Sequence, residues 1–356
     1  MPEIEALEGA VIGALRGGDL AGVRAILPAA EAAAPGPLKP HYRALRSVLD
    51  GDDAAAAAAW EALLESREEA TARLALRYFR LIGRAAQRAG RGPTLAASLD
   101  RLTRSVPGIS VAAPEYDPEH VRRAEARRQA LAGAGLPSIL LCVMPTSAGS
   151  VLHDRLHAAL GNAGHRISTH TEPDHVVPAW LEAFFAAGGA VGGNLTEASD
   201  ASLDALGRAG VPRVLVHVCH PGAALVRLVD HVTRVVLGHP LRRLEWPYDL
   251  PPGWNDWDDP RRIDWAAEHH LPRLAAWARD WHAVAADPRR RGALEVLVTD
   301  DAALETDEAA VFGRIAAFYG LPPTILYRGG GRPAVATAWE RRLGPGALAR
   351  LEAVLG

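Results

Sequence analysis

The stretch SILLCVMPTSAGSVLHDRL (Ser138–Leu156) decides the fold of this chain. An apolar run typical of a buried β-strand enters a small, hydroxyl-rich turn, and an amphipathic helix follows. The strand pattern returns in RVLVHV (Arg213–Val218) and in LEVLVT (Leu294–Thr299), with helical segments between them. Continuous apolar strands joined by helical crossovers predict a parallel sheet with helices on both faces. We therefore expect an α/β domain over residues 138–356.

The part of the chain before this domain carries helical periodicity and almost no strand signal. Residues 10–27 read as helix, Gly-Gly-Asp turn and helix, and residues 43–64 repeat that plan 33 residues later. This offset is close to the period of about 34 residues of tetratricopeptide helix pairs. We expect an all-α domain of helical hairpins over residues 1–105, either tetratricopeptide-like or of a generic helical type. The proline-containing segment 106–137 reads as a linker followed by a solvated helix.

Composition narrows the classes of function. The chain has 356 residues, 49% apolar and 23% charged, which is ordinary for a globular protein and excludes a disordered chain. Its net charge of −3, with histidine neutral, offers no basic field for a polyanion, so we expect no nucleic-acid partner. A run of about 20 apolar residues is absent from the sequence, so we expect no membrane span and a cytoplasmic location.

Two residue counts bear on the chemistry. Of the 39 basic residues only Lys39 is a lysine, so the expected α/β domain holds arginines but no lysine ammonium group. The two cysteines, Cys142 and Cys219, lie far apart in apolar runs. This placement fits buried thiols in a reducing compartment better than a disulfide or a metal site.

The turn Pro145–Ser150 is the strongest candidate for a ligand site. A turn between a strand and a helix presents backbone N–H groups and a helix N-terminus to an anion, and hydroxyl groups add further donors. The turn is not a Walker loop, because the Gly-Lys-Ser/Thr ending is missing.

Four segments, in order, resemble the superfamily of sulfotransferases that use 3′-phosphoadenosine 5′-phosphosulfate (PAPS). Met144–Leu152 is similar to the family's 5′-phosphosulfate loop, and Val214–Asp230 is similar to its 3′-phosphate segment. Leu294–Pro322 and Arg332–Arg341 resemble its late strand with an acidic turn and its closing segment. The resemblance implies a P-loop-like central parallel sheet flanked by helices. It also implies sulfuryl transfer from PAPS to a hydroxyl of a glycan or a small natural product.

The resemblance further implies a donor site. It assigns cofactor binding to seven positions: Thr146, Ser147, Gly149, Ser150, Arg227, Arg332 and Trp339. The first four belong to the loop on the 5′ side of PAPS, and the two arginines would serve its 3′ side.

The chain departs from the family pattern where the family carries charge. Thr146 stands in place of a loop Lys or Arg, and Cys219 stands in place of the arginine for the 3′-phosphate. Asn194 replaces the histidine that activates the acceptor, and an amide cannot act as a base. Charge-assisted phosphate contacts contribute roughly 1.5–3 kcal/mol each. We therefore expect the loss of two or three of them to weaken PAPS binding by several orders of magnitude.

Two polar regions are candidates for other roles. The candidate catalytic residues are His170 and Glu172, in the loop Ile167–His175, together with Asn194. The polar residues of this loop could instead form a metal site or cap the helix that follows. We assign no metal. The Trp-rich loop Pro247–Asp259 places aromatic rings beside carboxylates, which suits a glycan or aromatic acceptor or a partner protein.

Three functions follow from these observations. The first is a sulfotransferase-like enzyme that acts on a glycan or small-molecule hydroxyl. The second is a non-catalytic, degenerate sulfotransferase that binds a ligand or a protein partner through its N-terminal helices and its Trp-rich loop. The third is an enzyme that has adopted a different donor.

Overall fold

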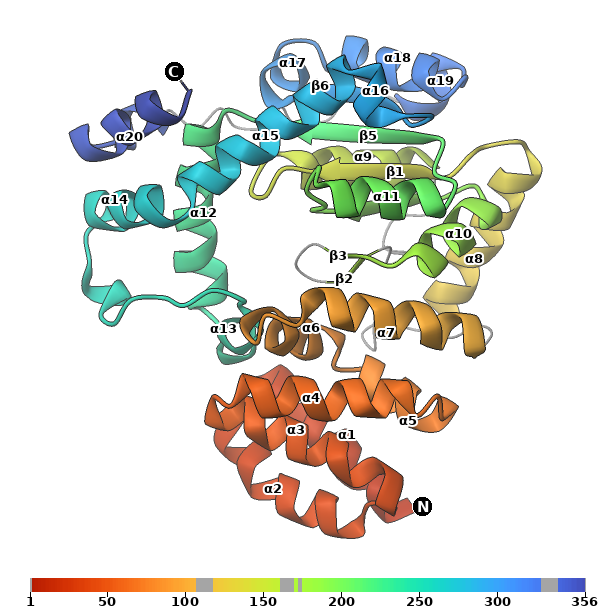
Figure 1. Ribbon diagram of the computed structural model, residues 1–356, viewed down its shortest axis with the longest axis vertical. Coiled ribbons are helices and arrows are strands. Elements are labelled where there is room, and N and C mark those ends of the chain that lie inside the picture. Colours follow the sequence, from red (N-terminus) through yellow and green to blue (C-terminus); the bar gives the residue numbers. More distant parts are fainter. Residues whose placement is uncertain (1, 107–117, 161–169, 172–174, 328–338, 356) are drawn as a thin grey trace. The chain divides into compact units, whose positions relative to one another are not determined.

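A computed structural model describes residues 2–106, 118–160, 170–171, 175–327 and 339–355. This part of the chain is mostly helical and contains a four-stranded parallel sheet (Figure 1). The chain divides into two compact units. Unit 1 comprises Met1–Pro114, His170–Val177 and Val232–Pro251, and unit 2 comprises Glu115–Thr169, Pro178–His231 and Pro252–Gly356. Residues 170–177 and 232–251 thus belong to unit 1, although the sequence analysis grouped them with the α/β domain.

Unit 1 is built from helices that pack in sequence order. Its larger helices are α1 (Pro2–Gly17), α2 (Leu20–Ala33), α3 (Lys39–Asp50), α4 (Asp53–Glu65), α5 (Glu69–Leu76), α6 (Phe79–Arg88) and α7 (Gly92–Ser105). Short elements complete it: η1 (Gly36–Leu38), β2 (His170–Thr171), β3 (His175–Val176), the π-helix η2 (Val232–Val236) and α13 (Pro240–Glu245). α1 packs on α2, α3 on α4, and α4 on α6. The tetratricopeptide character of this unit stays a prediction.

Local chemistry explains two of the turns in unit 1. Gly18 and Gly51 adopt φ angles of 74° and 82°, a left-handed conformation that glycine accepts without steric cost. Asp19 then accepts a hydrogen bond from the N–H of Gly22 at 2.8 Å and caps α2. Asp52 caps α4 in the same way. A helix-ending glycine followed by a capping aspartate therefore sets each helix boundary.

The core of unit 1 contains a buried polar group. The Glu8 carboxylate accepts hydrogen bonds from the hydroxyls of Tyr42 at 2.9 Å and Tyr78 at 2.7 Å. Burial raises the pKa of Glu8, and the two tyrosine hydrogen bonds partly offset that effect. Nearby, Trp60 Nε1 donates to His41 Nδ1 at 3.1 Å.

Unit 2 is organised around a parallel sheet of strand order β4-β1-β5-β6. The strands are β1 (Ile139–Val143), β4 (Val191–Asn194), β5 (Arg213–Val218) and β6 (Glu295–Asp300). Cys142 pairs with Asn194 on one side and with Val216 on the other, and His217 pairs with Thr299. The predicted parallel sheet is confirmed, and three of its strands lie in the apolar runs that predicted them. β4, whose sequence is VGGN, is an edge strand that the hydrophobic pattern did not predict.

Helices surround this sheet. They are α8 (Pro118–Gly133), α9 (Gly149–Leu160), α10 (Pro178–Ala187), α11 (Asp200–Arg208), α12 (Pro221–His231), α14 (Asp259–His269), α15 (Leu271–Ala286), α16 (Pro288–Arg291), α17 (Asp301–Thr306), α18 (Glu308–Phe318), α19 (Pro323–Leu326) and α20 (Pro345–Leu355), with the 3₁₀ turns η3 (Trp254–Asp256) and η4 (Trp339–Arg342). A core cluster joins Leu141, Leu156, Leu215 and Phe312. None of the described helices is long and apolar enough to span a membrane.

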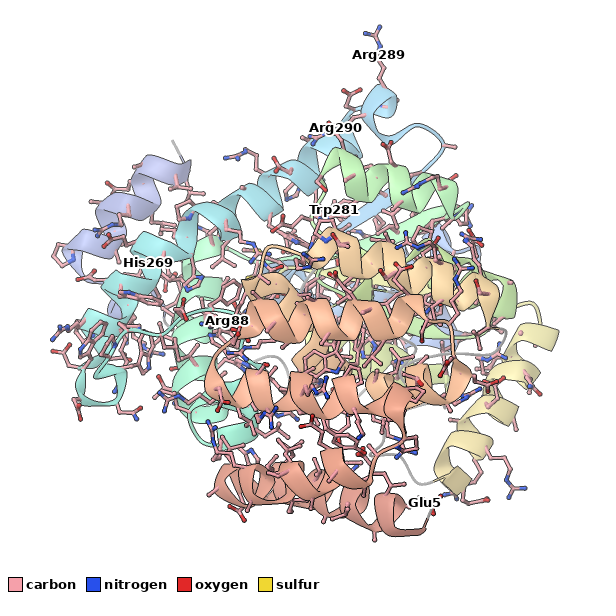
Figure 2. The ribbon with its side chains drawn as sticks, turned by 60° about the horizontal axis from the view of Figure 1, so that its bottom comes forward. Glu5, Arg88, His269, Trp281, Arg289 and Arg290 are labelled. Carbon is pink, nitrogen blue, oxygen red and sulfur yellow. The ribbon has the colours of Figure 1, made fainter. Side chains whose placement is uncertain are left out.

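The tryptophans of α15 belong to the core of unit 2. Trp277 and Trp281 are buried, and Trp281 Nε1 donates to the carbonyl oxygen of Thr196 at 2.9 Å. Arg289, on the following helix α16, extends away from the protein (Figure 2). The sulfotransferase type of this α/β unit stays a prediction.

Candidate functional site

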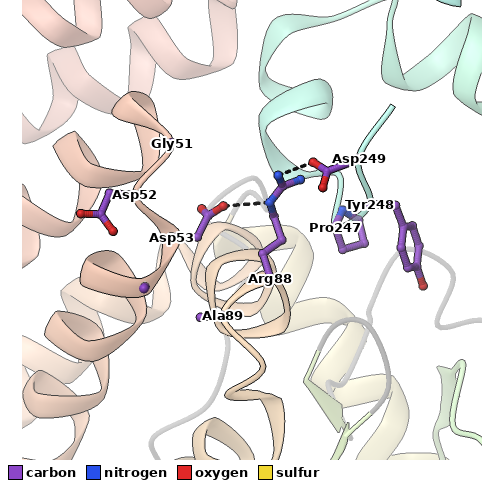
Figure 3. A pocket seen from close by; sticks show the side chains of 9 residues that line it. Gly51, Asp52, Asp53, Arg88, Ala89, Pro247, Tyr248 and Asp249 are labelled. Carbon is purple, nitrogen blue, oxygen red and sulfur yellow. Dashed lines mark hydrogen bonds and ion pairs between the residues drawn. The ribbon is translucent and has the colours of Figure 1, made fainter. Parts of the chain in front are cut away.

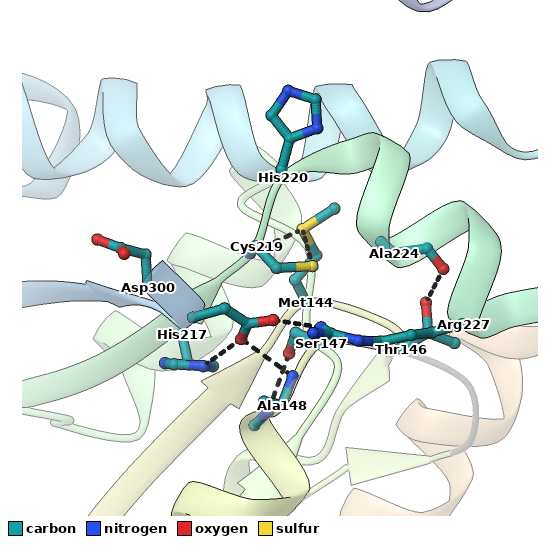
Figure 4. A network of polar contacts seen from close by, with 12 residues as sticks. Met144, Thr146, Ser147, Ala148, His217, Cys219, His220, Ala224, Arg227 and Asp300 are labelled. Atoms are coloured by element: carbon teal, nitrogen blue, oxygen red, sulfur yellow. Dashed lines mark hydrogen bonds and ion pairs between the residues drawn. The ribbon is translucent and has the colours of Figure 1, made fainter. Parts of the chain in front are cut away.

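The candidate site lies in unit 2, at the carboxyl edge of the sheet. Three strands end there: β1 continues into the loop 144–148, β5 into Cys219 and His220, and β6 into Asp301 (Figure 4). The carboxyl ends of parallel strands meet at one edge, which is where α/β sheets bind ligands. We call these three strand ends and the helix starts that follow them the edge site.

Thr146 shapes the first loop of the edge site. Its φ angle of 61° is left-handed, which is a costly conformation for a β-branched residue. The Thr146 hydroxyl donates to the carbonyl oxygen of Ala224 in α12 at 2.7 Å. This hydrogen bond ties the loop to α12 and helps to hold the strained backbone in place.

The N–H groups of the loop have partners inside the protein. The N–H of Ser147 donates to the carbonyl oxygen of Met144 at 3.0 Å, and that of Gly149 donates to Ser147 Oγ at 3.1 Å. Between them, the N–H of Ala148 donates to Asp301 Oδ1 at 3.1 Å. Three successive N–H groups of the expected phosphate loop are thus already hydrogen-bonded. The Ser150 side chain is exposed at the start of α9.

Asp301 is the centre of the polar network in the edge site. His217 Nε2 lies 2.8 Å from Asp301 Oδ1, and the Arg227 guanidinium contacts Asp301 Oδ2 (Figure 4). Burial alone would raise the pKa of the Asp301 carboxyl, but the hydrogen bonds and charges of His217 and Arg227 outweigh burial and lower that pKa. His217 Nδ1 also lies 3.0 Å from Thr299 Oγ1. His217 is therefore a hydrogen-bonded core residue.

The start of α12 is covered by an aromatic pair. Trp339, from η4, stacks on His220 with ring centroids 4.4 Å apart and an interplanar angle of 18°. A Cβ atom on Gly222 would lie only 2.6 Å from the Trp339 ring, so this position accepts no side chain without a shift. Trp339, which the resemblance assigns to cofactor binding, thus contacts His220, and both lie against the first turn of α12.

Neither thiol is chemically activated. Burial, followed by the charge of Asp301, raises the pKa of the Cys219 thiol to about 12. Burial also raises the pKa of Cys142. A nucleophilic cysteine needs a lowered pKa, so the edge site does not fit thiol chemistry.

Asn194 lies at the end of β4 and is buried, with 3% of its surface exposed. Its Oδ1 accepts a hydrogen bond from the N–H of Thr196 at 3.2 Å. His153 of α9, which the sequence analysis did not single out, packs its ring against Gly193 beside it. His153 Nε2 lies 3.1 Å from His157 Nε2. Two histidines four residues apart, on one face of the helix that follows the loop, are the sequence signal that would have found this pair.

Other predicted residues cannot be placed in the edge site. Glu172 and Arg332 lie outside the described residues, and so does the side chain of His170. The backbone of His170 pairs with Val176 in the two-stranded sheet of unit 1. The described part of the chain contains no cluster of three or more side chains suited to hold a metal ion.

The Trp-rich region forms an aromatic cluster in unit 2. Trp254 and Trp265 pack edge to face with centroids 5.3 Å apart, and Trp265 stacks on His269 at 4.3 Å. The Arg261 guanidinium lies 4.1 Å from the centroid of the Trp257 ring, a cation–π contact. Trp257 and Trp265 are half-buried, so part of each indole faces solvent. We call these five residues the aromatic cluster.

Unit 1 contains a cleft of about 480 Å³ (Figure 3). Its lining includes the start of α4, the end of α6 and the loop 247–249. Arg88 Nε donates to Asp53 Oδ2 at 2.8 Å, and the same guanidinium contacts Asp249. Arg88, Asp53 and Asp249 of the cleft are thus engaged with one another, and none of the expected cofactor residues is in its lining.

Comparisons of the chain with models of protein families, with curated proteins and with solved structures find no match. A function for this chain must therefore be argued from the chemistry of the edge site and of the aromatic cluster.

Proposed function

We propose that this chain is a non-catalytic, sulfotransferase-like binding protein. Its own side chains fill the place where the resemblance implies a donor site. One observation carries the proposal. The N–H of Ala148 and the guanidinium of Arg227, the groups best suited to an oxyanion, both bind the Asp301 carboxylate. Since a donor shared with an internal carboxylate is not free for a phosphate group, a charged nucleotide would have to displace Asp301.

PAPS does not fit the residues at the edge site. Ser147 and Gly149 are hydrogen-bonded to each other, and Thr146 bonds to α12 instead of offering charge. On the other side, Trp339 covers Gly222 at the start of α12. The only lysine of the chain is Lys39, in unit 1, so no ammonium group of unit 2 can replace the missing loop cation. We therefore route no chemical step through PAPS.

The aromatic cluster is the part of unit 2 best suited to a ligand. Half-buried indole faces stack on the C–H face of a sugar ring or on an aromatic group. The exposed Asp256 and Asp258 beside the cluster supply acceptors for hydroxyl groups. The ligand we propose is a glycan or a small hydroxylated molecule, and the helices of unit 1 offer a surface for a protein partner.

Calorimetry with adenosine 3′,5′-bisphosphate tests the proposal on the full chain. We expect no heat of binding even at about millimolar nucleotide, where a Kd of 1 mM corresponds to about −4.1 kcal/mol. Micromolar binding that Arg227→Ala abolishes would overturn the proposal and favour the enzyme. Arg350→Ala is the matched control, because Arg350 pairs with Glu268 on the surface and lies outside the edge site.

An enzyme is the second candidate function, and two observations favour it. The strained backbone of Thr146 is of the kind that gathers at functional sites. His153, packed against Gly193, lies next to the position where the resemblance implies a base. If the chain transfers a group from PAPS or another donor to a glycan or small-molecule hydroxyl, His153→Gln should abolish the transfer. Product formation that survives in this variant would exclude His153 as the base.

A further inference from the structure

We propose that the Ala148 N–H, His217 and Arg227 together form an oxyanion-binding site in which the Asp301 carboxylate is the resident anion. This inference rests on the proposed function and says what fills the donor site. The site belongs to the edge site, and the ligand class it takes is a carboxylate or a similarly sized oxyanion.

The geometry is that of a built anion site. Three donors from three elements converge on one carboxylate: the backbone N–H of Ala148 at 3.1 Å, His217 Nε2 at 2.8 Å and the Arg227 guanidinium. They come from the loop after β1, from β5 and from α12, while Asp301 comes from the start of α17. A backbone N–H at a helix start, an imidazole and a guanidinium are all groups that proteins use to hold oxyanions.

Burial makes an anion necessary at this place. The side chain of His217 is fully buried, and those of Asp301 and Arg227 are 10% and 20% exposed. A guanidinium with so little contact with water needs an opposite charge, because burying an unpaired ion is strongly unfavourable. Removal of the Asp301 carboxylate would leave the positive group and the loop N–H in place without their acceptor. An anion from solution is the simplest replacement.

The position also agrees with the electrostatics of the fold. Ala148 directly precedes α9, so its N–H lies at the positive end of that helix. The N–H groups of Ser147 and Gly149 on either side are satisfied within the loop. Of these three successive N–H groups, that of Ala148 is therefore the one directed at an acidic side chain, and that side chain also binds Arg227.

The test uses the full-length variant Asp301→Ala. Its thermal midpoint is measured in sodium chloride, formate, acetate and phosphate at equal ionic strength. We expect formate and acetate to raise the midpoint in a saturable manner, by about 3–6 °C at a concentration of ten times Kd. Calorimetry on the folded variant should give binding of one acetate or formate. Phosphate tests whether the loop widens for a tetrahedral oxyanion, and a phosphate effect as large as that of acetate also supports the site.

Two control proteins make the result specific. In the wild type the site is filled, so formate and acetate should act like chloride. Asp300→Ala removes the neighbouring carboxylate, which caps α17 through the N–H of Ala303 at 2.7 Å and does not contact Arg227. This variant should lose stability without any rescue by formate or acetate. Equal effects of the anions on all three proteins would overturn the inference.

A second variant covers the case in which Asp301→Ala does not fold in chloride. Folding in acetate or formate alone would itself support the site. Asp301→Ser also removes the carboxylate and leaves space for a small anion, so acetate and formate should stabilise it more than they stabilise the wild type. An Asp301→Ala that folds in none of the salts, together with an Asp301→Ser that does not respond to acetate or formate, overturns the inference. Binding of adenosine 3′,5′-bisphosphate by the wild type would instead overturn the proposed function, so the two failures are distinguishable.

Discussion

The ion pair between Arg227 and Asp301 should stabilise unit 2 by an amount that Arg227→Met measures. Methionine keeps most of the apolar stem of arginine and removes the charge. Exposed ion pairs contribute about 0–1 kcal/mol, and breaking a fully buried pair costs about 3–5 kcal/mol. Because the side chains of Arg227 and Asp301 are 20% and 10% exposed, we expect the free energy of unfolding to fall by about 2–3 kcal/mol at neutral pH.

The pH dependence of this loss has a definite sign. In the wild type, His217 and Arg227 lower the pKa of Asp301, so the contribution of Asp301 is present above its unfolded pKa of about 3.9 and is lost as the pH falls through the folded pKa. Without Arg227, burial weighs more heavily and the pKa of Asp301 rises. The folded variant then takes up a proton at a higher pH than the wild type does. The stability difference between the two proteins should therefore shrink as the pH is lowered from about 7 towards 3.5.

Urea unfolding followed by tryptophan fluorescence measures both quantities. Seven of the nine tryptophans lie in unit 2, so this signal reports mainly on that unit. Arg350→Met is the control, because its partner Glu268 and Arg350 itself are largely exposed, and its effect should stay below about 0.5 kcal/mol. A loss for Arg227→Met that is as small as this control, or one that stays constant as the pH falls, refutes the reasoning.

Three further substitutions test other parts of the structure. Gly222→Ala should lower the free energy of unfolding in urea by about 1–3 kcal/mol, because the added Cβ pushes Trp339 aside. Gly207 has open space around its Cβ position, so Gly207→Ala should leave that free energy unchanged or raise it. Because the pKa of Glu8 is raised in the folded state, the wild type should lose stability as the pH rises from about 4.3. Glu8→Gln should remove this decline, which thermal unfolding followed by circular dichroism measures. Thr146→Val should cost about 1–2 kcal/mol through the lost hydroxyl, and the serine variant should not.

Each of these has an outcome that would count against it. Equal effects at Gly222 and Gly207 would mean that Trp339 does not cover α12 in solution. An unchanged pH slope in Glu8→Gln would place the titrating group elsewhere in unit 1. Equal losses for the valine and serine variants of Thr146 would show that the hydroxyl bond to α12 contributes nothing measurable.

Much of unit 2 could be predicted because its signals are local. β1 and β5 are apolar runs that are buried on both faces, and β6 is a half-buried apolar run at the edge of the sheet; the sequence shows all three runs directly. β4 was not predicted, because two of its four residues are glycines, which carry no hydrophobic signal. Only its pairing with β1 makes it a strand.

The polar partners could not be predicted from the sequence. Arg227 was expected to face a phosphate pocket, and it faces Asp301 instead. Trp339 was expected to serve the cofactor, and it stacks on His220. Both alternatives use the same side-chain chemistry, and the residue types alone do not choose between a ligand and an internal partner.

The sequence by itself determined the helical character of residues 1–105, three strands, the turn chemistry at Gly18 and Gly51, and the absence of a lysine from unit 2, because each depends on neighbouring residues or on composition alone. The tertiary structure decided what the edge site binds. Ala148, Arg227 and Asp301 come from distant parts of the chain, and only the sheet brings their donors and acceptor within hydrogen-bonding distance. Once they meet, the internal carboxylate satisfies the site, since the largely buried guanidinium needs an opposite charge beside it.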